Sequence, residues 1–144
     1  MMGGEMFRQI QASTFGVLEK TPPPSAVFLK SPEAWRQRYR LNDSFIGFRG
    51  HFEGHPVLPA LAQVFFAQHL VQAVVKRQVT LETIIQAKFL SLVRPGRLMS
   101  VYVPFSEAYD ALEWRVHLTS AAEGRPETDA SFLRLKFKED GHGL

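Results

Sequence analysis

Residues 50–59 hold side chains that could do proton chemistry, because His51, Glu53 and His55 stand close together in the sequence. The same stretch contains two glycines and two prolines. Glycine permits positive φ angles and proline fixes φ, so the sequence predicts a shaped loop here and not a strand or helix. An imidazole titrates near neutral pH and suits a general base. A histidine held by loop backbone hydrogen bonds is the plainer alternative, and Glu53 and His55 are interpreted as exposed loop residues.

This loop leads directly into a stretch that predicts a buried helix. Residues 61–75 carry no charge, and Pro59 is a good first-turn residue. A helix that is apolar nearly all round is buried, and this one is too short to span a bilayer. Its first amides, at Ala60 and Leu61, would face the loop, where the helix dipole favours negative charge. An ordinary helix start is the alternative. The polar side chains of the stretch are Gln63, Gln68, His69 and Gln72.

The loop carries a resemblance to a known family. Gly50-His51-Phe52-Glu53-Gly54-x-Pro56-Val57-Leu58-Pro59 resembles the Gly-His-Phe-Pro-Gly-x-Pro-Val-x-Pro-Gly signature of 3-hydroxyacyl-[acyl carrier protein] dehydratases of the hot-dog fold. It is most similar to the dehydratase-like branch of aryl polyene biosynthesis, where Gly-Val-Val-Gln-Leu-Asp follows the loop and Gln63 falls on that Gln. Ala87-Lys88-Phe89 with Arg94-Pro95-Gly96 resembles a Lys-Phe-x-x-x-x-x-Pro-Gly hairpin of the same families. The similarity covers residues 42–103.

The resemblance implies an α+β hot-dog fold, in which an antiparallel sheet wraps around one long central helix. It also implies a homodimer or a higher oligomer of dimers, with active sites at the subunit interface. His51 would be the base that removes the α-proton of an acyl thioester. The amides of Ala60 and Leu61 would hold the thioester carbonyl, and the thioester would come from acyl carrier protein or CoA. The substrate-binding positions would be Phe52, Gly54, Pro56, Val57, Pro59, Gln63 and Phe65.

The chain departs from the family pattern at two positions. Ala60 replaces the glycine that starts the helix, which keeps the amide but adds a methyl group. Phe65 occupies the position of the helix carboxylate, and phenylalanine cannot give a proton to the departing hydroxide. His51 could return the proton that it removes. His69 lies one turn after Phe65 on the same helix face. It is a candidate substitute acid, but a hydrogen-bonded core histidine is the favoured interpretation.

Three functions follow from these residues. The first is elimination of water from a 3-hydroxyacyl thioester to give a trans-2-enoyl thioester, in fatty-acid or polyene-type biosynthesis. The second is an acyl thioester hydrolase, which also needs a carboxylate to activate water. The third is a non-catalytic acyl-binding subunit, paired in a heterodimer with another hot-dog chain that supplies the carboxylate. His51 favours the first function over the third, and Phe65 favours the reverse.

Composition bounds these interpretations. The chain has 144 residues, with 45% hydrophobic and 22% charged, which predicts one globular domain over residues 1–144 with a poorly determined lead-in at 1–24. A net charge of +3 permits an acidic partner but does not indicate nucleic acid. The absence of cysteine excludes disulfides and thiol chemistry. We expect no metal, no cofactor and no membrane contact. No signal peptide is visible, so a cytoplasmic location is the default.

Hydrophobic periodicity predicts strands around the helix. Residues 26–30 are predicted as a strand, and residues 34–41 alternate between two faces. Trp35, Gln37, Tyr39 and Leu41 lie on one face, and Arg36, Arg38 and Arg40 lie on the other. The arginines are interpreted as a solvated face, with carrier-protein docking as the alternative. Residues 83–93, 98–105, 112–120 and 128–138 are predicted as antiparallel strands. A further set of aromatic residues is expected mostly in the core, and some of it could line an acyl tunnel: Phe45, Phe48, Phe52, Phe65 and Phe66.

Overall fold

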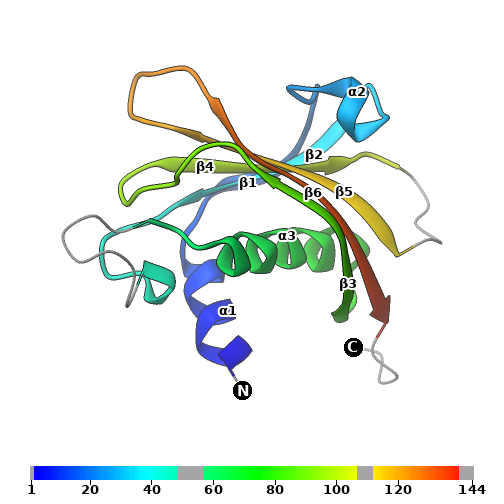
Figure 1. The fold of residues 1–144 in the computed structure, drawn as a ribbon, viewed down its shortest axis with the longest axis horizontal. Coiled ribbons are helices and arrows are strands. Elements are labelled where there is room, and N and C mark those ends of the chain that lie inside the picture. The colour runs from blue at the N-terminus through cyan, green and yellow to red at the C-terminus, as the bar shows by residue number, and fades with distance from the viewer. Residues whose placement is uncertain (1, 49–56, 107–111, 140–144) are drawn as a thin grey trace.

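In the computed structural model, the described residues are 2–48, 57–106 and 112–139. They form a six-stranded sheet in the order β1-β2-β4-β5-β6-β3, and every pairing is antiparallel. One long helix, α3, packs on one face of the sheet, and the short α2 lies on the other face (Figure 1). The elements are α1 (Met2–Ala12), β1 (Thr14–Thr21), α2 (Ala26–Leu29), β2 (Ala34–Arg40), η1 (Ile46–Phe48), α3 (Ala60–Val75), β3 (Val79–Phe89), β4 (Leu98–Pro104), β5 (Glu113–Ala121) and β6 (Thr128–Glu139).

The α3 helix is the centre of the hydrophobic core. Phe66 is fully buried, and its ring packs edge-on against Tyr39 of β2 at 4.9 Å and tilted against Phe45 at 5.5 Å. The helix ends at Lys76, which adopts a left-handed φ of 60° and donates its N–H to the carbonyl of Gln72. The predicted buried helix that begins beside Pro59 is therefore confirmed.

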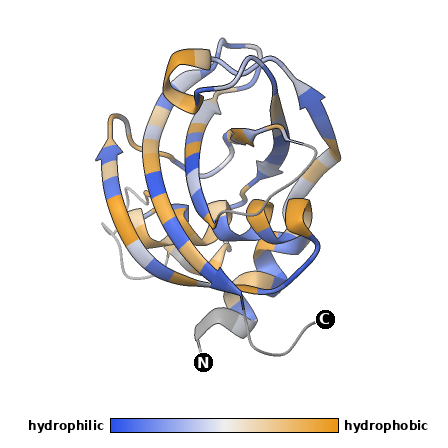
Figure 2. Cartoon of the chain, turned by 90° about the vertical axis from the view of Figure 1, so that its right-hand side faces the viewer, coloured by the Kyte–Doolittle hydropathy of each residue, from blue (hydrophilic) through white to orange (hydrophobic). Residues whose placement is uncertain are grey.

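The strands present alternating faces to the core and to the outside, as the banded colouring of Figure 2 shows. Val101, Val116 and Leu133 are fully buried against α3. The prediction that β2 has one core-facing side and one outward-facing side is also confirmed, because Tyr39 is buried in the core while Arg36 reaches Glu19 on β1. Strands β4, β5 and β6 begin and end within one residue of the predicted bounds.

The strand predicted at residues 26–30 is wrong, because Ala26–Leu29 forms one turn of helix. Ser25 caps this turn, since its Oγ accepts a hydrogen bond from the N–H of Phe28 at 3.1 Å. Lys30 closes it with a left-handed φ of 55°. Only Leu29 of this helix is buried, so local capping outweighs the strand propensity of the apolar run.

Strand β3 begins four residues earlier and ends four residues earlier than predicted, at Val79–Phe89 instead of 83–93. Side chains of α3 hold its first residue: Val79 donates its N–H to Gln72 and accepts a hydrogen bond from Gln68. At the other end, Leu90 and Ser91 both bond to the carbonyl of Ala130, which ends the regular pairing with β6.

Residues 2–21, which form α1 and β1, belong to the packed fold. Met6 and Ile10 of α1 are buried against the core cluster, and β1 pairs with β2 as one edge of the sheet. α1 lies on the far side of α3 from the sheet (Figure 1). This placement gives α1 direct contact with the candidate site.

Candidate functional site

The candidate site lies at the N-terminal end of α3. Pro59 occupies the N-cap position with an extended backbone, and its own side chain makes no capping hydrogen bond. The first amides of a helix have no partner within the helix, and here the first helical bond runs from the N–H of Gln63 to the carbonyl of Pro59 at 3.2 Å. Ala60 and Leu61 are exposed. Their N–H groups therefore form a positively polarised helix end that no side chain of the described residues caps, and such an end suits a developing negative charge.

The methyl group of Ala60 is compatible with this role. Among the described residues, only Lys30 and Lys76 combine a side chain with a positive φ, so Ala60 has an ordinary negative φ. A glycine is not required for this backbone geometry. Exchanging the family's glycine for alanine leaves the amide in a normal helical position.

A hydrogen-bonded connection fixes the helix end relative to the sheet. Gln63 is 3% exposed, and its Oε1 accepts a hydrogen bond from Ser131 of β6 at 2.8 Å. Its Nε2 donates to the carbonyl of Leu58 at 3.5 Å, and the N–H of Leu58 donates to the carbonyl of Val93 at 2.7 Å. The side chain of Gln63, expected to contact substrate, thus holds the entry to α3 in place.

Phe65 packs against α1. It is half-buried, and its ring lies 6.1 Å from the ring of Phe7. The position at which the family carries a carboxylate is therefore part of an aromatic contact between α3 and the N-terminal helix.

His69 is held by two hydrogen bonds. Its Nε2 lies 2.7 Å from Oε1 of Gln11, and its Nδ1 lies 2.8 Å from the hydroxyl of Tyr39. The Gln11 oxygen can only accept, so Nε2 carries the proton and Nδ1 accepts from Tyr39. Burial raises the pKa of Tyr39, which keeps this hydroxyl a donor. Burial also lowers the pKa of His69 from its usual 6.5. A neutral imidazole whose two nitrogens are both hydrogen-bonded fits the interpretation of His69 as a core histidine better than its interpretation as a general acid.

The loop that is predicted to be catalytic lies outside the described residues. His51, Phe52, Glu53, Gly54, His55 and Pro56 are the predicted residues that fall there. Of the remaining predicted loop positions, Val57 is 7% exposed and Pro59 is the N-cap residue of α3.

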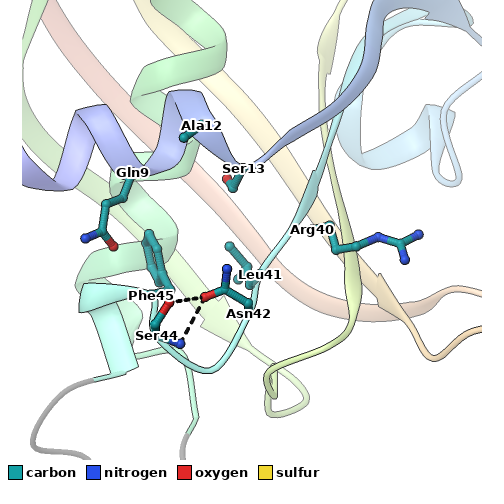
Figure 3. A pocket seen from close by; sticks show the side chains of 8 residues that line it. All are labelled: Gln9, Ala12, Ser13, Arg40, Leu41, Asn42, Ser44 and Phe45. Atoms are coloured by element: carbon teal, nitrogen blue, oxygen red, sulfur yellow. Dashed lines mark hydrogen bonds between the residues drawn. The ribbon is translucent and has the colours of Figure 1, made fainter.

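A crevice of about 220 Å³ lies between α1 and the segment after β2 (Figure 3). Most of its polar groups bind neighbouring protein groups: Asn42 Oδ1 accepts from both the N–H and the Oγ of Ser44, and Gln9 Oε1 accepts from the N–H of Ile46. The charged end of Arg40 points away from the other lining residues (Figure 3). The crevice therefore holds the chain before the predicted catalytic loop in place, and its described lining offers no reactive group.

Sequence reasoning missed Ser131, Gln11 and Phe7. Ser131 carried a detectable signal, because it continues the two-residue spacing of the inward-facing Leu133, Leu135 and Phe137 toward the start of the strand. A polar side chain at a core-facing position needs a partner, and an uncharged helix offers few. Nothing in the sequence pattern indicates which α3 residues Phe7 and Gln11 contact.

The fold defines the class of protein. The chain matches an uncharacterized protein from Erwinia carotovora (19% identity, 90% of this chain and 93% of that chain, TM-score 0.63). It also matches the dehydratase heterocomplex ApeI:P from Xenorhabdus doucetiae (19% identity, 83% of this chain and 93% of that chain, TM-score 0.56). A third match is a hexameric thioesterase from Yersinia pestis (11% identity, 74% of this chain and 92% of that chain, TM-score 0.54). The architecture is the hot-dog fold, as the resemblance implied.

The sequence comparisons define the family. The ApeI-like family, described as ApeI dehydratase, matches residues 29–128. The chain is also 30% identical over 96 residues to the 3-hydroxyacyl-[acyl-carrier-protein] dehydratase FabZ of Rickettsia conorii, a match that covers 61% of this chain and 66% of that protein. The chain belongs to the ApeI-like dehydratase family. Among the described residues, no helix is long and apolar enough to cross a membrane.

The environment of His69 predicts a pH-dependent stability. Because the folded pKa lies below the unfolded value of 6.5, the unfolded chain binds more protons as the pH falls through that region. The stability that neutral His69 provides is complete above the unfolded pKa and is lost as the pH drops toward the folded pKa. We expect His69→Gln to lose less stability than the wild type between about pH 7 and pH 5 in urea unfolding.

Glutamine can still form hydrogen bonds with Tyr39 and Gln11 but does not titrate, so the comparison isolates the effect of protonating His69. If both proteins lose the same free energy of unfolding over this range, His69 is not held neutral by its surroundings.

Proposed function

We propose that this chain eliminates water from a 3-hydroxyacyl thioester to give a trans-2-enoyl thioester. The observation that carries the proposal is the N-terminal end of the buried α3, which no side chain of the described residues caps and which directly follows the Gly-His loop in a chain of the dehydratase family. The acyl group is carried by acyl carrier protein or CoA, in fatty-acid or polyene-type biosynthesis. The 30% identical dehydratase FabZ, named for an acyl-carrier-protein substrate, supports the carrier assignment.

In this proposal His51 removes a proton from C2 of the acyl chain. The C–H electrons form the C2–C3 double bond, and the C3–O bond breaks with its electrons on the hydroxyl oxygen. Negative charge that develops on the thioester oxygen is stabilised by the N–H groups of Ala60 and Leu61. The departing hydroxide needs a proton to leave as water.

That proton comes from His51 in our proposal. Phe65 has none to give, and its ring is anchored on Phe7. His69 is neutral and bound at both nitrogens. The imidazolium formed at His51 by the first transfer can return the same proton to the leaving oxygen, so one residue serves as base and then as acid.

A non-catalytic partner subunit is the second candidate, and the packing of Phe65 favours it. In that case another hot-dog chain supplies the carboxylate across the interface. The solved structure described as the dehydratase heterocomplex ApeI:P supports such pairing. Thioester hydrolysis also needs a group to activate water, and the solved thioesterases share only the fold with this chain.

The absence of a carboxylate at position 65 allows a direct test of the proposed dehydration by substitution. His51→Ala should abolish conversion of a 3-hydroxyacyl thioester to its 2-enoyl product, followed by absorbance or mass spectrometry. Phe65→Glu should raise the rate by up to about 10²-fold, because a carboxyl group beside the Phe7 ring has a raised pKa and can donate a proton. Phe65→Gln is the matched control, since it has the same shape and no proton to give.

The outcomes separate the candidates once circular dichroism shows that each variant folds. A wild type that is inactive and binds thioester equally well after His51→Ala is a partner subunit. If Phe65→Glu and Phe65→Gln give equal rates, no acid acts from this helix position.

The sheet edge at β3 predicts a dimer. β3 pairs with β6 on one side only, and the apolar side chains on and after it are exposed, including Ile84 at 44%, Phe89 at 43% and Leu92 at 60%. An exposed apolar edge strand pairs readily with another chain. A second hot-dog subunit fits this edge, and the resemblance places the active site between subunits.

Light scattering should therefore give about twice the chain mass of 16.3 kDa. Ile84→Lys should weaken the dimer, because it places a charge at the edge. Val17→Lys, at an exposed position on the opposite edge strand β1, should not. A wild type that is monomeric at micromolar concentration would contradict both the homodimer and a site shared between identical chains.

A further inference from the structure

A groove lies on the face of the sheet that points away from α3. It has a volume of about 420 Å³ and runs between α2 and strands β3, β5 and β6. Figure 1 places α2 on this face, across the sheet from α3 and the proposed catalytic end. The residues that matter for its chemistry are Val27, Phe28, Gln86, Lys88, Arg115 and Phe132.

Aromatic rings form one wall of the groove. Phe28 packs edge-on against Phe132 with their ring centroids 4.7 Å apart, and Phe132 stacks on the buried His117 at 4.3 Å. The cap at Ser25 and the buried Leu29 hold the α2 turn over these rings. Val27 is 89% exposed at the mouth of the groove. This part of the groove suits an apolar group about the size of a ring or a short acyl chain.

The other wall is cationic, and no carboxylate of the described residues pairs with its charges. Arg115 lies directly opposite Arg134 in the pairing of β5 with β6. Like charges in this arrangement are destabilising. Arg134 has a carboxylate partner, Glu113, at 2.8 Å, whereas Arg115 forms no ion pair with any described residue. The Arg115 guanidinium instead donates to the carbonyl of Phe28 at 3.3 Å and lies over the Phe28 ring.

Lys88 adds a second charge at the same wall. It lies opposite Phe132 in the pairing of β3 with β6, so both side chains share the outer face. Within the described part of the chain Lys88 has no carboxylate partner either. Gln86, two residues earlier on the same face, contributes an amide donor. Two unpaired cations beside an apolar wall match a ligand that is anionic at one end and apolar at the other.

We propose that this groove binds a small amphiphilic anion. Its carboxylate or phosphate group lies against Lys88 and Arg115, and its apolar part packs on Phe28 and Phe132. The bound anion relieves the repulsion between Arg115 and Arg134. Because the groove is on the opposite face of the sheet from α3, this binding is separate from the proposed dehydration.

The test titrates the full chain with octanoate and with octyl phosphate, followed by amide chemical shifts in NMR spectra. The two probes distinguish a carboxylate from a phosphate head group. Octanol, which lacks the charge, and acetate, which lacks the chain, are the ligand controls. We expect shifts at Phe28, Lys88, Arg115 and Phe132 with at least one of the two anions, and weaker binding of both control compounds.

Arg115→Gln and Lys88→Gln should each weaken binding by about tenfold, because each removes a charge-assisted contact. Lys138→Gln, at an exposed β6 position outside the groove, is the control and should bind like the wild type. The proposal is overturned if neither anion shifts the groove residues, if octanol binds as tightly as the anions, or if both groove variants keep wild-type affinity. Failure at the groove would leave the effect of His51→Ala on turnover unchanged.

Discussion

The pairing of the few polar groups on a buried helix determines how α3 sits on the sheet. A polar group buried without a partner costs about 1–3 kcal/mol, so each must find one. Gln63 binds Ser131 of β6, Gln68 and Gln72 bind the backbone of Val79, and His69 binds Tyr39 of β2 and Gln11 of α1. Apolar packing alone would let the helix slide or rotate, whereas these bonds fix its position. The uncapped amides at its start are fixed with it.

The contacts with α1 change how the missing carboxylate is understood. Phe65 and His69 lie one turn apart on the same helix face, and both contact α1, through Phe7 and Gln11. The aromatic residue at position 65 is therefore one member of a wider contact between two helices. This explains how the fold accommodates the substitution. In the proposed dehydration, the proton donor is therefore the loop histidine, and in the partner-subunit alternative it belongs to another chain.

Much of the fold could be predicted because it follows from periodicity. The uncharged run after Pro59 predicted α3, and the alternation in residues 34–41 predicted which face of β2 is buried. The turn at Ala26–Leu29 was missed because a single serine hydroxyl and a left-handed lysine decide it. The start of β3 was missed because side chains of α3 hold Val79, and such contacts between distant segments leave no local pattern.

The candidate site was predictable only in part. The position of the helix end followed from the sequence, but the roles of its side chains depend on tertiary partners. Gln63 is predicted to contact substrate, and the structure gives its side chain a second task, because it supports the helix entry through Ser131. For His69, the hydrogen-bonded alternative fits the contacts with Tyr39 and Gln11.

The central claim is that the start of α3 holds a thioester carbonyl. The most direct measurement is a crystal structure of the assembled protein bound to a stable 2-enoyl amide of pantetheine. The account predicts the amide carbonyl oxygen about 3 Å from the backbone nitrogen of Ala60 or Leu61, with the His51 imidazole beside C2 of the acyl chain. A carbonyl bound away from this helix end, or an acyl chain that does not approach His51, would contradict it.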